Sequence, residues 1–154
     1  MNWAEKPTST IKTKDAIILK NPELLCSYSD REFVNTLEIR DGMSVLDVGV
    51  FKGRDIRMLW HRFPGNRFVG VDIQPLCINL CRKRNADTTI EFYVASVLSL
   101  PFKDKEFDLV YSNGLLSDLD TDEDRRIAIS EMRRVAKSYA MCDSDQNLDF
   151  IYGD

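Results

Sequence analysis

Short apolar runs alternate with amphipathic segments along the chain from residue 44 onwards. Apolar runs bounded by turn residues are typical of buried strands, whereas apolar residues at i, i+3, i+4 and i+7 indicate a helix that packs on one face. The segment 54–63 has the helical spacing, and its apolar residues are Ile56, Leu59, Trp60 and Phe63. The pattern predicts strands at 44–49, 67–73, 89–96, 107–113 and 138–144, and helices at 54–63, 75–85 and 121–137.

Turn and capping residues support these elements. Asp41-Gly42 precedes the first strand, and Pro64-Gly65-Asn66 follows the first helix. Pro75 suits the first turn of a helix, where a missing N–H costs nothing. Thr121 and Asp124 have the spacing of a capping box, which predicts the start of the last helix.

Strands that alternate with helices favour an α/β fold, with a parallel sheet covered by helices on both faces. The right-handed rule for crossovers makes that sheet doubly wound. A chain of 154 residues is expected to form one compact domain. Within it, we expect residues 1–40 to form an N-terminal arm with helices (22–38 in particular) and residues 41–154 to hold the sheet.

Composition and charge narrow the class of protein. Hydrophobic residues make up 44% of the chain and charged residues 30%, with a net charge of −4. This charge gives no general basic field for nucleic acid. No apolar run approaches the roughly 20 residues of a membrane helix, and no signal peptide is visible, so we expect no membrane partner and a cytoplasmic protein. The cysteines form no CxxC, so reduced thiols and no metal site are expected at Cys26, Cys77, Cys81 and Cys142.

The segment 45–53, VLDVGVFKG, places Gly49 and Gly53 directly after the first predicted strand. Asp72 ends the second predicted strand, 23 residues after Gly49. Ligands of open α/β sheets bind beyond the carboxyl ends of the strands, where glycine lets the backbone approach and an acid accepts hydrogen bonds from ribose hydroxyls. The segment therefore predicts a ligand that contains adenosine.

The kind of adenosine ligand follows from spacing and charge. A dinucleotide fingerprint requires GxGxxG, whereas the chain from Gly49 reads Gly-Val-Phe-Lys-Gly-Arg. A carboxylate at Asp47 also works against a pyrophosphate. An acid at this place favours a ligand that carries a positive amino group.

Four motifs resemble the class I S-adenosylmethionine (SAM)-dependent methyltransferases of the small-molecule type, similar to the type 11 domains, over residues 43–142. The family's D-x-G-x-G-x-G reads Asp47-Val-Gly49-Val-Phe51-Lys-Gly53 here, and GVDIQP resembles its ribose motif. SLPFKDKEFDLVYSNGLL and EMRRVAK resemble the family's later LPF…FD and EM-x-RVLKPGG segments. The resemblance implies a Rossmann-like doubly wound parallel sheet of about five strands and SAM as cofactor, with S-adenosylhomocysteine as product.

The resemblance also implies roles for single residues. Around the methionine end it places Asp47, Gly49 and Gly53, with Phe51 in the same loop. Around the adenosine it places Asp72 and Ile73 at the ribose and Ser96 and Val97 at the adenine edge. Beneath the reacting centre it places Ser112 and Asn113, and it makes Tyr28 a lid contact. No catalytic residue is assigned, because the methyl group of SAM is already activated and the protein mainly aligns the reactants.

The chain departs from the family's pattern at three places. Phe51 stands at the central glycine, and Ser96 stands where an acid usually binds the adenine amino group. After residue 137 the usual C-terminal antiparallel hairpin is lacking. The sheet edge that this leaves is expected to be covered by residues 148–152 or by a second subunit, and a homodimer is the expected state.

Two functions remain open at this point. One is a methyltransferase that acts on an unidentified small-molecule acceptor. The other is a non-catalytic SAM-fold protein that binds a ligand or a partner, which Phe51 and Ser96 favour. The five acids of 116–124 either cap the following helix, the interpretation we favour, or attract a cationic substrate.

Overall fold

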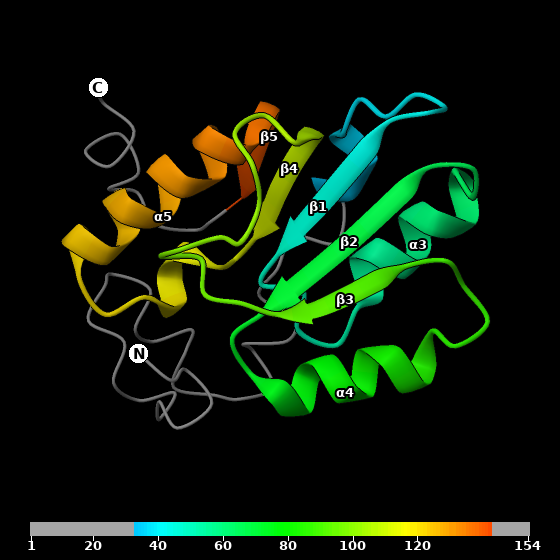
Figure 1. Ribbon diagram of the computed structural model, residues 1–154, viewed down its shortest axis with the longest axis horizontal. Coiled ribbons are helices and arrows are strands. Elements are labelled where there is room, and N and C mark those ends of the chain that lie inside the picture. Colours follow the sequence, from blue (N-terminus) through cyan, green and yellow to red (C-terminus); the bar gives the residue numbers. More distant parts are fainter. Residues whose placement is uncertain (1–32, 143–154) are drawn as a thin grey trace.

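A five-stranded sheet forms the centre of the computed structural model, which describes residues 33–142 (Figure 1). The strands are β1 (Ser44–Val48), β2 (Arg67–Asp72), β3 (Glu91–Val94), β4 (Phe107–Asn113) and β5 (Ala136–Cys142). They lie in the order β3-β2-β1-β4-β5, and every pairing is parallel. The order reverses between β1 and β4, which is the switch point of a doubly wound α/β sheet. The predicted fold class is confirmed.

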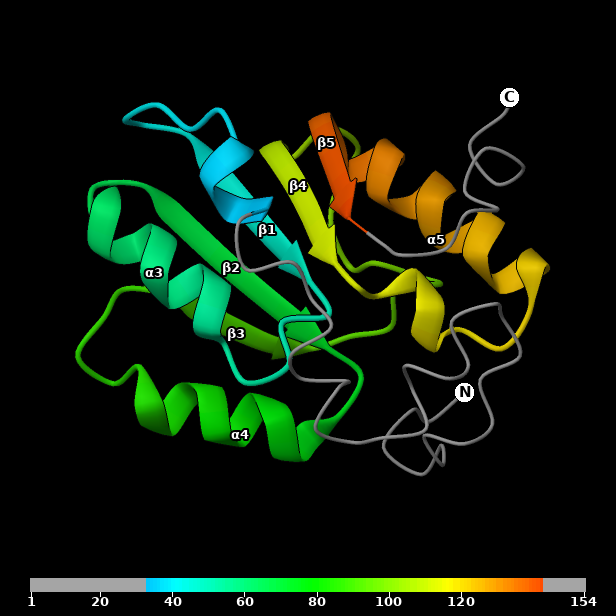
Figure 2. The same cartoon turned by 180° about the vertical axis from the view of Figure 1, so that it is seen from behind.

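Helices cover both faces of this sheet. They are the α-helices α3 (Arg54–Arg62), α4 (Pro75–Arg84) and α5 (Asp122–Val135), with the short 3₁₀ helices η2 (Phe33–Thr36) and η3 (Leu116–Asp118). Helices α3 and α4 pack on one face and α5 on the other, as the two opposite views show (Figures 1 and 2). The arrangement buries the central strands on both faces, whereas the edge strands β3 and β5 keep exposed side chains such as Tyr93 and Tyr139.

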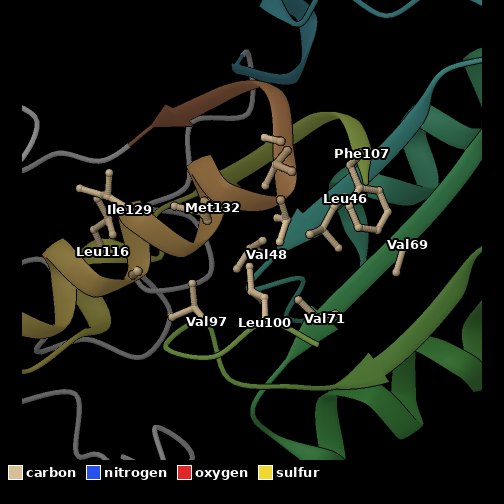
Figure 3. Packing of buried hydrophobic residues seen from close by; sticks show 14 of the residues in the cluster. Leu46, Val48, Val69, Val71, Val97, Leu100, Phe107, Leu116, Ile129 and Met132 are labelled. Atoms are coloured by element: carbon tan, nitrogen blue, oxygen red, sulfur yellow. The ribbon is translucent and has the colours of Figure 1, made fainter. Parts of the chain in front are cut away.

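Alternate residues of each strand enter two separate cores. On the α5 face, Leu46 and Val48 of β1 pack with Met132 of α5 (Figure 3). On the α3 face, Val45 packs with Leu109 and Tyr111 of β4. Because side chains alternate along a strand, Asp47 points to the same face as Tyr111.

The helix starts agree with the predicted caps. Pro75 occupies the first turn of α4. The hydroxyl of Thr121 accepts a hydrogen bond of 3.0 Å from the main-chain N–H of Asp124 at the start of α5. Such a cap contributes about 1 kcal/mol to helix stability.

Four predicted boundaries are wrong. The strand predicted at 89–96 is shorter and covers Glu91–Val94. The helix predicted to reach residue 137 ends at Val135, and the strand predicted to begin at 138 begins at Ala136. Ala136 already has extended dihedral angles and pairs with Phe107. Pairing with β4 therefore overrides the helical pattern of the sequence, and the chain passes from α5 into β5 without a loop.

Some expectations concern residues that lie partly or wholly outside 33–142. In the segment predicted as helical at 22–38, the described part holds only the 3₁₀ helix Phe33–Thr36. Tyr28 and residues 148–152 lie outside the described residues, so the division into an arm and a sheet domain stays a prediction. Among residues 33–142, no helix combines the length and apolar character needed to cross a membrane.

Candidate functional site

The turn between β1 and α3 has left-handed backbone at every second residue. Gly49, Phe51 and Gly53 have φ angles of 78°, 53° and 79°. Left-handed backbone costs a residue with a Cβ roughly 1–2 kcal/mol, whereas glycine adopts it freely. Phe51 therefore takes up a backbone conformation that usually requires glycine.

Space as well as backbone angle requires the two glycines. A Cβ on Gly49 would lie 3.0 Å from Cδ1 of Leu115. A Cβ on Gly53 would lie 3.2 Å from Sγ of Cys81. The turn is thus held closely between the segment after β4 and helix α4.

Asp72 joins this turn to the next one. Its side chain is only 2% exposed at the end of β2. Oδ2 accepts a hydrogen bond of 3.0 Å from the main-chain N–H of Phe51, and Oδ1 accepts one of 3.0 Å from the N–H of Gln74. A carboxylate oxygen can accept more than one hydrogen bond.

A pocket opens beside these two turns, at the edge where the arrowheads of β1, β2 and β3 lie (Figure 1). Its empty volume is about 410 Å³, which includes open solvent at the mouth. Its lining is mainly apolar and consists of Val48, Gly49, Val71, Asp72, Ile73, Ala95, Ser96, Val97, Leu98, Leu115 and Leu119.

Half of the predicted site residues line this pocket. Those that do are Gly49, Asp72, Ile73, Ser96 and Val97, whereas Asp47, Phe51, Gly53, Ser112 and Asn113 do not. The hydroxyl of Ser96 accepts a hydrogen bond of 3.1 Å from the N–H of Leu98, which shapes the turn after β3. Ser96 makes no other side-chain hydrogen bond among the described residues. Unlike a carboxylate, its hydroxyl group can also donate a hydrogen bond.

Two buried carboxylates flank the glycine turn, and β4 supplies a donor to each. The hydroxyl of Tyr111 donates to Oδ2 of Asp47 at 2.8 Å. Nδ2 of Asn113 donates to Oδ2 of Asp55 at 2.9 Å. Sequence reasoning missed Tyr111 and Asp55, although the alternation of Tyr111 with Asn113 in strand 107–113 is the pattern that puts both donors on one face.

Burial changes the proton affinity of this cluster. It raises the pKa of Asp47 well above its ordinary value, and the Asp55 carboxylate adds to the increase while the Tyr111 hydrogen bond opposes it. Burial and the nearby Asp47 also raise the pKa of Tyr111. The end of β1 is therefore a place where a positive ligand group would be strongly favoured.

Ser112 and Cys81 complete the surroundings of the turn. Ser112 is fully buried, and its Oγ has no hydrogen-bond partner within the part of the chain that the structure describes. The thiol of Cys81 donates to the carbonyl oxygen of Phe51 at 3.1 Å, and burial raises its pKa to about 12. Across residues 33–142, no group of three or more His, Cys, Asp or Glu side chains has the arrangement of a metal site.

Comparison with known proteins gives a match that spans the sheet and the pocket. A family model described as a methyltransferase domain matches residues 45–139. The chain belongs to the class I SAM-dependent methyltransferase family. The family motif on Asp47, Gly49 and Gly53 therefore stands at the β1–α3 turn described above.

Individual relatives of this methyltransferase domain are longer than the chain. A fatty-acid O-methyltransferase from Mycolicibacterium smegmatis is 33% identical over 96 residues, which are 61% of this chain and 35% of the relative. A SAM-dependent methyltransferase from Methanosarcina mazei has 25% identity and a TM-score of 0.60, with 64% of this chain and 50% of that chain covered. One from Aquifex aeolicus has 19% identity and a TM-score of 0.63, with 80% and 72% covered, and shows the fold alone. The chain spans about a third of the curated relative and half of the M. mazei protein.

Proposed function

We propose that the chain binds SAM at the carboxyl edge of β1, β2 and β3 and transfers its methyl group to a small-molecule acceptor. The observation that carries the proposal is the pocket that adjoins both the left-handed turn and the buried carboxylate of Asp72. The turn packs closely against Leu115 at Gly49 and against Cys81 at Gly53, and Gly49 also lines the pocket.

The residues of the site fit the parts of SAM. Asp72 and Ile73 would hold the ribose, and Ser96 and Val97 would meet the adenine edge in the apolar pocket. Asp47 would supply a negative charge for the amino group of the methionine part. Ser112 offers a buried hydroxyl without a described partner on the strand that ends below the turn. The sulfonium supplies an activated methyl group, so the protein's main task is alignment.

We propose fatty acids as the first acceptors to test. The fatty-acid O-methyltransferase named above is 33% identical to this chain. A carboxylate is already ionised at neutral pH, so it attacks through oxygen without needing a base. His61 is exposed on α3, so the described part of the site contains no histidine paired with an acid. An acceptor that needs no base suits such a site.

A non-catalytic SAM-fold protein is the second candidate function. It is favoured by the Phe51–Asp72 contact, because both oxygens of Asp72 already accept a main-chain N–H. Fold alone does not fix activity. In that case the protein acts as a binding or interaction partner and transfers no methyl group.

Transfer of a labelled methyl group from SAM distinguishes the two functions. We expect labelled methyl ester from one or more fatty acids of medium or long chain, and no label with Asp72→Ala. Lack of transfer to every acceptor, with SAM binding intact, would support the non-catalytic function instead. We also propose that the protein forms a homodimer, which light scattering after size exclusion measures directly.

A further inference from the structure

Tyr111 reaches the site through Asp47, and neither the family motif nor the predicted site includes it. The two residues are 64 positions apart and lie opposite each other in the parallel pairing of β1 with β4. Their side chains share the α3 face of the sheet, and both are buried, at 0% exposure for Tyr111 and 4% for Asp47. The hydroxyl donates to Oδ2 at 2.8 Å, so water does not mediate this contact.

We propose that Tyr111 is a positioning residue that keeps the Asp47 carboxylate oriented and ionised at the end of β1, for the positive amino group of the cofactor. The proposal rests on the proposed function for its ligand. The Tyr111–Asp47 pair itself is independent of the proposed function, because the ligand-free protein contains it.

Other groups around Asp47 make such a donor necessary. Asp55 on α3 and Asp72 on β2 are both negative neighbours that raise its pKa, and burial raises it most. The Cys81 thiol on α4 also faces this region, since Asp47 in turn raises its pKa. Among the described groups that act on Asp47, Tyr111 is the one that lowers its pKa. Without the hydroxyl, nothing in this set opposes protonation of Asp47.

The chain offers a matched control for removing the hydroxyl. Tyr93 on β3 donates to Oε1 of Glu91 at 2.8 Å, so it makes the same kind of hydrogen bond to a carboxylate. That pair is exposed on the edge strand, with Tyr93 41% exposed, and neither residue lines the pocket. Tyr93→Phe therefore removes an equivalent bond without touching Asp47.

The first test needs no cofactor. The side-chain carboxyl signal of Asp47 is followed by carbon NMR against pH in ligand-free protein, and Asp47→Asn assigns it. In Tyr111→Phe we expect the midpoint to rise by about one to two pH units, the size of one hydrogen bond to a charged group. In Tyr93→Phe it stays where it is in the wild type. An unchanged midpoint in Tyr111→Phe would overturn the proposal, since Tyr111 would then only fill space.

The second test links the pair to the ligand. SAM affinity is measured between about pH 5 and pH 7, where the α-amino group of the ligand remains protonated. Tyr111→Phe should lose affinity at a higher pH than the wild type does, because affinity requires ionised Asp47. A uniform loss at every pH would indicate packing alone and contradict the proposal.

Asp47→Asn keeps the test decisive if Tyr111→Phe does not fold. It retains the shape of the side chain and removes its charge, so the pH dependence of SAM affinity should flatten. A profile like that of the wild type would show that the Asp47 charge is not used, and the proposal would fall. If the wild type binds no SAM at any pH, the proposed function is wrong, while the NMR midpoint still decides whether Tyr111 governs Asp47.

Discussion

The main-chain N–H of Phe51 donates a hydrogen bond of 3.0 Å to Oδ2 of Asp72, which ties the glycine turn to the end of β2. The other oxygen of Asp72 holds the N–H of Gln74 in the turn that leads into α4. One buried carboxylate thus organises both loops of the site before any ligand binds. Its effect on the loops is separable from its proposed contact with the ribose of SAM.

Asp72→Asn tests this double role. The amide has one acceptor oxygen, so one of the two main-chain N–H groups faces a donor and loses its partner. We expect ligand-free protein to lose about 1–3 kcal/mol of unfolding free energy and SAM affinity to fall at least about tenfold. Urea unfolding and calorimetry measure the two effects.

Asp108→Asn is the matched control for Asp72. Asp108 also holds a main-chain N–H through a carboxylate, that of Ser44 at 2.9 Å, and it does not line the pocket. It should lower stability and leave SAM affinity unchanged. Equal SAM affinity in Asp72→Asn and wild type would mean that the cofactor site lies elsewhere.

Phe51 allows backbone strain to be separated from the size of the ring. Phe51→Gly removes both the ring and the penalty of the left-handed φ of 53°. Phe51→Ala removes the ring and keeps the penalty. We expect the glycine variant to be more stable than the alanine variant by about 1 kcal/mol. This difference is the cost of left-handed backbone for alanine minus the conformational entropy that glycine loses on folding. Thermal and urea unfolding measure the stability of both variants. Equal stability of the two variants would show that the backbone at residue 51 is not strained.

The same pair of variants shows what the ring does to the cofactor. If the ring obstructs the site, SAM binds more tightly to both variants than to the wild type. Weaker binding to both would show that the ring packs on the cofactor.

A series of glycine substitutions separates strain from crowding in the turn. The new Cβ of Gly65→Ala meets no atom within 4 Å, and the backbone there is not left-handed. Gly42→Ala places alanine at a φ of +87°, also without a contact within 4 Å. Gly49→Ala adds both a φ of +78° and the contact with Leu115 at 3.0 Å. The free energy of unfolding should therefore fall in the order Gly65, Gly42, Gly49, with about 1–2 kcal/mol lost at Gly42.

SAM binding should respond to that series differently. Only Gly49→Ala alters the wall of the pocket, so it alone should abolish binding in calorimetry. Loss of binding in Gly42→Ala, far from the pocket lining, would contradict the assignment of the turn as the cofactor loop.

The buried thiol of Cys81 makes stability depend on alkaline pH. Its pKa rises from 9.0 to about 12 in the folded protein. The unfolded chain releases this proton above about pH 9 and the folded chain does not, so stability is present below pH 9 and is lost as pH rises. In Cys81→Ala the fall above pH 9 should be shallower, by up to about 1.4 kcal/mol per pH unit. Parallel curves from urea unfolding would show that Cys81 does not titrate in this way.

Much of the fold follows from local pattern. The apolar periodicity of 54–63 predicts α3, and Pro75 predicts the start of α4. Both signals are local, since they depend on residues close together in the sequence. The start of β5 at Ala136 could not be predicted, because it depends on pairing with Phe107 of β4. A helical pattern in the sequence does not show at which residue pairing with a neighbouring strand ends the helix.

The site was predictable to the extent that motifs mark it. Gly49 follows β1 and Asp72 ends β2, so the sequence places them at one edge of the sheet, and both line the pocket. The Tyr111–Asp47 pair joins residues 64 positions apart, and only the register of β1 with β4 brings them together. Tyr28 lies outside the described residues and remains a prediction.

Calorimetric titration of the wild-type protein with SAM and with S-adenosylhomocysteine tests the central claim most directly. The account predicts binding of both ligands in the micromolar range, which corresponds to about −8 kcal/mol, and an increase of the melting temperature with each. No heat and no thermal shift with either ligand would contradict it, and would mean that the pocket beside Asp72 is not a SAM site.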